Sequence, residues 1–145
     1  MQVEVRTGEI DEAVALSRQI PEFHAPYDSS EYERRLGNKG MVLIAASNET
    51  AVGFKVGYDR YLDNVHYYSW FGGVTPAFRR LGIARLLQER METQVRKMGY
   101  RILRFKTLNK HRNMIHFALD SGFYVYSFKE MEDPMESKIY FEKRL

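Results

Sequence analysis

Residues 74–85 constrain the fold most, because they join a strand pattern directly to the longest helical pattern of the chain. Residues 66–74 are rich in aromatic and β-branched side chains, which favours a strand. Across residues 80–98, apolar side chains recur every four positions, as in a helix that covers a core. Gly99 then suits the end of that helix. A strand, a short loop and a long helix are therefore predicted in succession.

This junction has the chemistry of an anion-binding site. The first N–H groups of a helix lack partners within it and point out of its end, where the helix dipole adds positive charge and phosphates commonly bind. Gly82 and Ala84 are small enough to let a phosphate reach the backbone. Positive charge is added by Arg79, Arg80 and Arg85. The spacings of a Walker loop, GxxxxGK(S/T), and of GxGxxG are both absent.

Hydropathy periodicity predicts the remaining elements. Strands are expected at residues 3–6, 41–46, 51–61, 66–74, 101–108, 123–128 and 137–141, and helices at 10–20, 31–36, 80–98 and 113–121. Ser29 or Ser30 suits the N-cap of the second helix. Gly72 and Gly73 indicate a bulge or a close approach of two backbones near the end of their strand. The order of elements predicts a mixed α/β sheet with helices on both faces.

The length of 145 residues suits one domain spanning residues 1–145. The chain has no cysteine, which excludes disulfides, thiolate metal sites and cysteine nucleophiles, and no metal is expected. No apolar run approaches the ~18 residues that span a bilayer, and the first residues lack the layout of a signal peptide. We therefore expect a cytoplasmic protein with no membrane partner.

Positive charge is concentrated in one part of the chain. The net charge is +3, but residues 76–112 hold eleven Lys and Arg against two Asp and Glu. Such a block suits nucleic acid, an acidic membrane surface or a phosphorylated ligand, or it is a solvated helix face with ion pairs. Charge alone does not choose among these.

The stretch Arg79-Arg80-Leu81-Gly82-Ile83-Ala84 resembles the Gln/Arg-x-x-Gly-x-Gly/Ala signature of the GNAT superfamily of acyl-CoA-dependent N-acyltransferases. The preceding Val74-Thr75-Pro76 is similar to the Val-x-Pro that leads into that signature. Gly122-Phe123, after a short helix, resembles the closing pattern of the family. The expected order of elements is also similar over nearly the whole chain.

The resemblance implies a GNAT-like, largely antiparallel mixed sheet of about seven strands, splayed in the middle and flanked by about four helices. Acetyl-CoA would lie in the splay, with its pantetheine along the strand that ends at Val74 and its pyrophosphate on the backbone N–H groups of the turn. The implied acetyl-CoA site consists of Gly72, Gly73, Val74, Arg79, Arg80, Leu81, Gly82, Ile83, Ala84, Arg85 and Asn109. For the asparagine of the family, Asn109 is favoured over Asn113, and strict spacing places His111 there.

The activity implied is transfer of an acetyl group to a primary amine by direct attack in a ternary complex, with an acid and a base moving protons. The chain departs from the family at both positions. Ala118 stands where many members have a tyrosine acid, and Tyr68 stands where some have a glutamate base. His66 and Tyr68 are the nearest candidates for catalysis, and Tyr124 or Tyr126 could replace the acid.

The acceptor side is expected from residues 21–35, the turn at 61–64 and the final hairpin. Phe23, Tyr27 and Glu31 are the candidate acceptor-binding residues. Several carboxylates occur in these segments: Glu22, Asp28, Glu31 and Asp63. Together with the aromatic residues they favour a cationic amine, partly through cation–π contact. Small molecules and peptide amines both fit this expectation.

Two other classes of function stay open at this stage. The missing tyrosine and glutamate suit a non-catalytic module of the same fold that binds acyl-CoA or docks a protein. The basic block alone would suit a nucleic-acid binder, which the signature makes the weaker alternative. Homodimers are common in the resembled family, but no segment identifies one here.

Overall fold

The computed structural model describes residues 2–37 and 39–145. Its strands are β1 (Val3–Thr7), β2 (Met41–Ser47), β3 (Thr50–Tyr58), β4 (His66–Val74), β5 (Ile102–Leu108), β6 (Tyr124–Lys129) and β7 (Lys138–Arg144). Its α-helices are α1 (Ile10–Arg18), α2 (Ser29–Leu36), α3 (Ile83–Lys97) and α4 (Arg112–Asp120), and short 3-10 turns span Pro76–Phe78 and Pro134–Glu136. Every predicted strand and helix is present, with small shifts at the ends.

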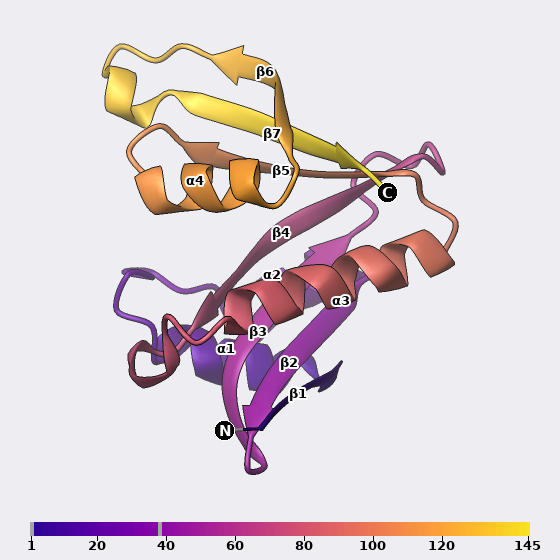
Figure 1. The fold of residues 1–145 in the computed structure, drawn as a ribbon, viewed down its shortest axis with the longest axis vertical. Coiled ribbons are helices and arrows are strands. Elements are labelled where there is room, and N and C mark those ends of the chain that lie inside the picture. Colours follow the sequence, from indigo (N-terminus) through magenta and orange to yellow (C-terminus); the bar gives the residue numbers. More distant parts are fainter. Residues whose placement is uncertain (1, 38) are drawn as a thin grey trace.

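The strands form one sheet in the order β1-β2-β3-β4-β5-β7-β6 (Figure 1). All neighbouring strands are antiparallel except β4 and β5 in the middle, which are parallel. The predicted mixed, largely antiparallel sheet of seven strands with four helices is thereby confirmed for the described residues. None of the helices in the described part of the chain has the length and apolar character of a membrane span.

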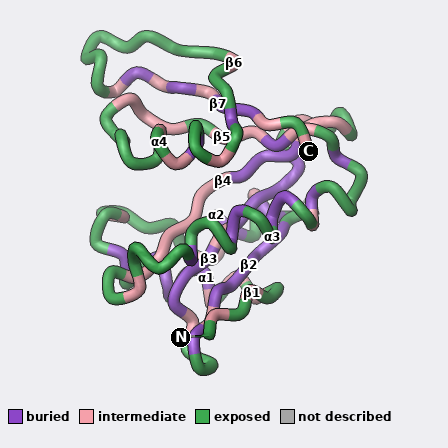
Figure 2. Tube along the Cα trace, viewed as in Figure 1, coloured by how far each residue is buried: buried purple, intermediate pink, exposed green. Residues whose placement is uncertain are grey.

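Helices pack on both faces of the sheet because each presents one apolar stripe. The stripe predicted for the long helix, Ile83, Leu87, Met91 and Val95, is buried in α3 against the core. α4 extends this core over β5 and β7. α1 and α2 cover the opposite face of β2, β3 and β4 (Figures 1 and 2). The buried segments in Figure 2 are concentrated in β2, β3, β4 and the inner side of α3.

Two helix starts differ from the sequence prediction. α3 begins at Ile83 rather than at residue 80, because Arg80 (φ 62°) and Gly82 (φ 81°) adopt left-handed backbone that a helix excludes. The cap of α2 is Asp28 rather than Ser29 or Ser30. Its carboxylate accepts a hydrogen bond from the N–H of Glu31 at 3.1 Å, so Asp28 fills the role of the predicted serine.

The centre of the sheet opens into a splay between β4 and β5. The two strands pair through His66, Tyr67 and Tyr68 of β4, and among the described residues no later pair joins them. Beyond Tyr68, β4 follows β3 while β5 follows β7, so the strands diverge (Figure 1). The last residues of β4 therefore expose a backbone edge toward the gap.

A β-bulge at Trp70 bends β4 where it leaves β5, since Val56 faces Phe71 while Gly57 faces Ser69. The sequence had indicated a bulge or a close approach at Gly72 and Gly73, and the close approach is what occurs. A Cβ on Gly72 would lie 2.4 Å from the carbonyl oxygen of Phe54 on β3.

Candidate active site

The turn between β4 and α3 exposes unpaired backbone N–H groups. The first hydrogen bond within α3 runs from the N–H of Leu86 to the carbonyl of Gly82. The N–H groups of Ile83, Ala84 and Arg85 precede that bond and have no acceptor among the described residues. The first turn of α3 also carries no acidic side chain. The helix end is thus positive and available to an anion.

Gly82 keeps the space above this turn open. Its φ of 81° is left-handed, and, apart from Gly82 and its chain neighbours, no described atom lies within 4 Å of the position that a Cβ would occupy. Arg80, Leu81 and Arg85 are exposed around it. Free amides, open space and nearby guanidinium groups fit a diphosphate.

The side chain and backbone N–H of Arg79 are already bonded within the protein. Its Nε donates to the carbonyl of Val74 at 3.0 Å, and its two Nη atoms donate to the carboxylate of Glu22 at 2.7 and 2.8 Å. Its backbone N–H donates to the carbonyl of Pro76. Arg79 therefore fastens the loop after α1 to the turn, and its guanidinium lowers the pKa of Glu22.

The glycines of β4 allow neighbouring elements to pack closely behind the exposed edge. A Cβ on Gly73 would lie 2.7 Å from Cδ1 of Ile20, and one on Gly72 would meet β3. Gly72, Gly73 and Val74 pair with β3 on one side only. The opposite backbone edge of these three residues faces the splay. This edge runs from the turn toward the closed end of the splay.

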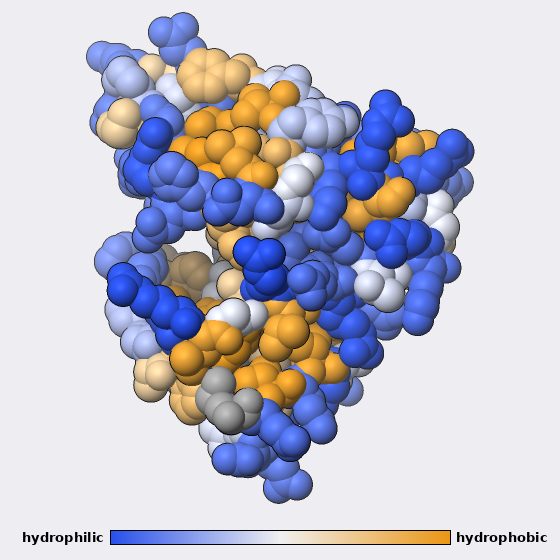
Figure 3. Space-filling model, viewed as in Figure 1, coloured by the Kyte–Doolittle hydropathy of each residue, from blue (hydrophilic) through white to orange (hydrophobic). Residues whose placement is uncertain are grey.

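A hollow of about 440 Å³ lies beside the splay, on the side of α1 and α2. Its lining is Phe23, His24, Ala25, Pro26, Tyr27, Arg35, Tyr68, Trp70, Phe71 and Lys106, and we call it the aromatic pocket. A second hollow of about 220 Å³, the β5 hollow, shares Lys106 with it. The β5 hollow is lined by Lys106, Thr107, Leu108, His111 and Lys138. Figure 3 shows an opening between the two halves of the molecule with hydrophilic side chains at its rim.

Tyr68 lines the aromatic pocket as a neutral phenol. Burial raises the pKa of Tyr68 to about 12, although the nearby guanidinium of Arg60 opposes the shift. That guanidinium lies 4.9 Å from the centre of the Tyr68 ring. At neutral pH the phenol can donate a proton or a hydrogen bond, but it cannot serve as a base.

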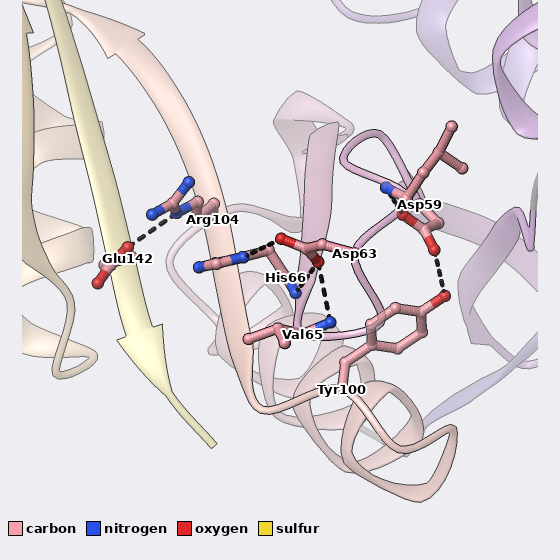
Figure 4. A network of polar contacts seen from close by, with 8 residues as sticks. Asp59, Asp63, Val65, His66, Tyr100, Arg104 and Glu142 are labelled. Carbon is pink, nitrogen blue, oxygen red and sulfur yellow. Dashed lines mark hydrogen bonds and ion pairs between the residues drawn. The ribbon is translucent and has the colours of Figure 1, made fainter.

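His66 lies two residues earlier in β4 and is oriented by Asp63 (Figure 4). Its Nδ1 is 2.6 Å from Oδ2 of Asp63, and the N–H groups of Val65 and His66 donate to Oδ1 at 2.9 Å. These bonds hold the pKa of Asp63 well below its usual range. A carboxylate at Nδ1 favours a proton there, which leaves Nε2 able to accept one. His66 lies at the closed end of the splay and is not among the residues that line the aromatic pocket.

The carboxylates expected to attract a cationic amine are bonded elsewhere. Glu22 binds Arg79, Asp28 caps α2, and Asp63 holds His66. Glu31 pairs with Arg34 and Arg35 and does not line the aromatic pocket. Those guanidinium groups lower the pKa of Glu31 to about 2. The structure thus provides no free carboxylate from this set, whereas Phe23 and Tyr27 do line the pocket.

Asn109 follows β5 and uses its side chain within the protein. Its Nδ2 donates to the carbonyl of Pro134 at 3.2 Å, and its Oδ1 accepts from Arg112 at 2.9 Å. Of the two tyrosines considered as acids, Tyr124 donates to Glu142 at 2.8 Å. Tyr126 packs under the guanidinium of Arg104, 4.0 Å from its ring centre.

Three residues of the aromatic pocket lie outside the residues and segments predicted from the sequence: Trp70, Phe71 and Lys106. The alternation of β5 places Lys106 on the same face as Arg104, and Tyr68 pairs with Arg104 across the closed end of the splay. Strand alternation was the available signal for Lys106. Trp70 and Phe71 required the packing of α2 on β4, where both contact the ring of Tyr32, and sequence periodicity does not provide that packing.

The sequence matches the family described as the acetyltransferase (GNAT) family over residues 9–123. No curated protein matches the chain in sequence. Among solved structures, the ribosomal-protein-S18-alanine N-acetyltransferase from Escherichia coli has a TM-score of 0.82 at 16% identity, covering 99% of this chain and 94% of that chain. An aminoglycoside 6′-acetyltransferase type Ii has a TM-score of 0.82 at 16% identity, covering 97% of this chain and 96% of that chain. A GNAT family acetyltransferase from Elizabethkingia anophelis with acetyl-CoA bound has a TM-score of 0.75 at 15% identity, covering 99% of this chain and 98% of that chain.

Proposed function

The chain belongs to the GNAT acetyltransferase family, and we propose that it transfers an acetyl group from acetyl-CoA to a primary amine while both substrates are bound. One observation carries the proposal. The unpaired edge of β4 connects a turn of free amides at Ile83–Arg85 with the aromatic pocket at Tyr68. A long phosphorylated ligand and a small amine can therefore meet in the splay. The solved acetyltransferase with acetyl-CoA bound shares this fold.

The residues present fit acetyl-CoA. The amides of Ile83, Ala84 and Arg85, with the open space over Gly82, would hold the diphosphate. Arg80 and Leu81 lie in the same turn and Arg85 adds charge, while Arg79 fixes the turn through Glu22. The backbone of Gly72, Gly73 and Val74 would pair with the pantetheine amides. Asn109 would position the loop after β5 through its bonds to Pro134 and Arg112.

When bound, acetyl-CoA supplies an activated acetyl thioester. The reaction forms a nitrogen–carbon bond and breaks a carbon–sulfur bond, with one proton leaving the amine and one ending on the thiol. We assign the acid to the neutral phenol of Tyr68, which faces the pocket. We assign the base to Nε2 of His66, acting through water, because the carboxylate of Asp63 lies 2.6 Å from Nδ1 and leaves Nε2 as the nitrogen directed elsewhere. Backbone N–H groups on the free edge of β4 would stabilise developing negative charge on the acyl oxygen.

Turnover separates this enzyme from a module that only binds acyl-CoA. The assay follows thiol release from acetyl-CoA across a panel of amines, with CoA binding measured by calorimetry on the same sample. Thiol release that depends on the amine supports the proposal. Binding of CoA without release for every amine would favour the non-catalytic module. Binding to DNA that rises steeply at low salt and is displaced by CoA would favour the nucleic-acid alternative.

A further inference from the structure

The aromatic pocket carries positive charge that its own lining does not offset. Arg35 and Lys106 both line it, and none of its lining residues is acidic. Lys106 also lines the β5 hollow beside Lys138, and that lining has no acidic residue either. The two hollows therefore share one lysine, and both present cationic side chains next to the splay.

Lys106 has no carboxylate within ion-pair distance among the residues described in the structure. Four cations act on Lys106, namely Arg35, Arg60, Lys129 and Lys138. Partial desolvation, together with these cations, lowers the pKa of Lys106, whose side chain is still exposed to solvent. Lys129 and Lys138 face each other in register across β6 and β7, and like charges placed opposite each other destabilise a sheet. These cationic side chains thus repel one another, and a bound anion would reduce that repulsion.

Three carboxylates on the elements around this cluster of cations are already in ion pairs. Glu136, two residues before Lys138, pairs with Lys110. Glu31 is shared by Arg34 and Arg35, so one negative charge meets two positive ones. Glu142 is held by Arg104 at 2.8 Å and accepts a second hydrogen bond from Tyr124. A cationic amine would consequently be repelled from this site, whereas an anionic group would be attracted.

The other walls of the aromatic pocket are flat rings that suit an apolar group. The rings of Tyr27 and Trp70 lie 5.0 Å apart, and the guanidinium of Arg35 lies 4.7 Å from the centre of the Trp70 ring. This stacking holds Arg35 in place beside the aromatic surface. The pocket therefore offers one charged contact and one apolar contact to the same ligand.

We propose that the acceptor is an amine that also carries a carboxylate, as an amino acid does, and that Arg35 and Lys106 bind this carboxylate. The inference rests on the proposed acetyl transfer and specifies its acceptor. The apolar side chain of the amino acid lies against Tyr27 and Trp70, and its amine points toward Tyr68 and the splay. A phosphonate could meet the same cations, so the test includes one.

Matched acceptors isolate the carboxylate. Phenylalanine, phenylalaninamide and the phosphonate analogue of phenylalanine are compared with acetyl-CoA by thiol release, and the same triplet is built on leucine and on methionine. We expect kcat/KM for the carboxylate to exceed that for its amide by about tenfold or more in at least one triplet. Amides that match or exceed their acids in every triplet overturn the proposal. A phosphonate preferred over its acid overturns the assignment to a carboxylate.

Variants of Lys106 test whether this residue causes the preference for a carboxylate over an amide. Lys106→Met is expected to reduce the acid-to-amide ratio of kcat/KM to about one, and Lys106→Glu to reverse it. Lys97→Met is the matched control, since Lys97 is an exposed lysine in the last turn of α3. The control should retain the full ratio. A ratio that survives both changes at Lys106 contradicts the proposed carboxylate site.

A binding measurement separates failure of this inference from failure of the proposed function. N-acetylphenylalanine and N-acetylphenylalaninamide are compared at equal concentration for their effect on the melting temperature, which needs no turnover. A larger rise with the anionic compound, lost in Lys106→Met, supports the anionic site even where no amine releases thiol. Equal shifts with both compounds overturn it even where acetyl transfer occurs.

Discussion

At the scale of single residues, Gly82 combines a structural requirement with a binding role. Its φ of 81° disfavours any side chain, and the space above it is open. Gly82→Ala is expected to lower stability by about 1 kcal/mol through the left-handed backbone. It should also weaken CoA binding by about tenfold, because a methyl group would stand over the free amides. Thermal melting and calorimetric titration with CoA measure the two effects.

Gly99→Ala is the control for that change. Gly99 has a φ of 99° and, like Gly82, open space around the position of a Cβ, but it follows the far end of α3. We expect a similar loss of stability and an unchanged Kd for CoA. Full CoA affinity in Gly82→Ala would refute the assignment of the turn as the diphosphate site.

Tyr68 is the residue whose hydroxyl we expect to matter most for turnover. Tyr68→Phe removes one oxygen and should lower kcat by about 10²-fold, with little change in KM, as for loss of a proton donor. Tyr58→Phe is the matched control, because the Tyr58 ring is also buried and lies 5.6 Å from Tyr68 without lining the pocket. Equal losses of kcat in both variants would indicate a packing effect instead.

At the scale of elements, the first turn of α3 has competing requirements. Acidic side chains normally stabilise a helix N-terminus, yet this turn has none and exposes Ala84. Ala84→Glu should therefore raise stability by about 0.3–1 kcal/mol. It should lower CoA affinity by about tenfold, because the carboxylate competes for the amides and repels the diphosphate. The melting temperature should thus rise, while the affinity for CoA measured by calorimetry should fall.

Ala84→Gln keeps the size of that side chain without its charge. We expect it to reduce CoA affinity much less than Ala84→Glu at low ionic strength, with the difference shrinking in salt. If the two variants lose the same affinity at every salt concentration, bulk rather than charge explains the effect.

Elements were predictable from the sequence because their signals are local, as the stripe from Ile83 to Val95 shows. The start of α3 was not, since nothing in the sequence of Arg80 requires a positive φ. Side-chain partners were predicted least well. Glu22 was expected to attract an amine, but it binds Arg79, 57 positions away. Such pairs depend on how α1, its following loop and the splay come together, which no local pattern specifies.

At the scale of the whole molecule, the splay divides the sheet into two halves that share a short central pairing. β1 to β4 and β5 to β7 are joined through three residue pairs between β4 and β5. The N-terminal half has its own core under α1 and α2, whereas the core under α3 continues across to α4 and β7. A ligand that lies along the free edge of β4 and beside β5 would therefore stabilise both halves at once.

Acetyl-CoA at 100 times its Kd should add about 2.7 kcal/mol, which raises the melting temperature of a chain of this size by about 5–10 °C. Adenosine 3′,5′-bisphosphate lacks the pantetheine arm and should protect only the amides around the turn from hydrogen exchange. Acetyl-CoA should in addition protect the last residues of β4, from Gly72 to Val74, and the diverging part of β5. Protection confined to the turn with both ligands would mean that the splay is not occupied, and the two substrates would then have no shared site in which to react.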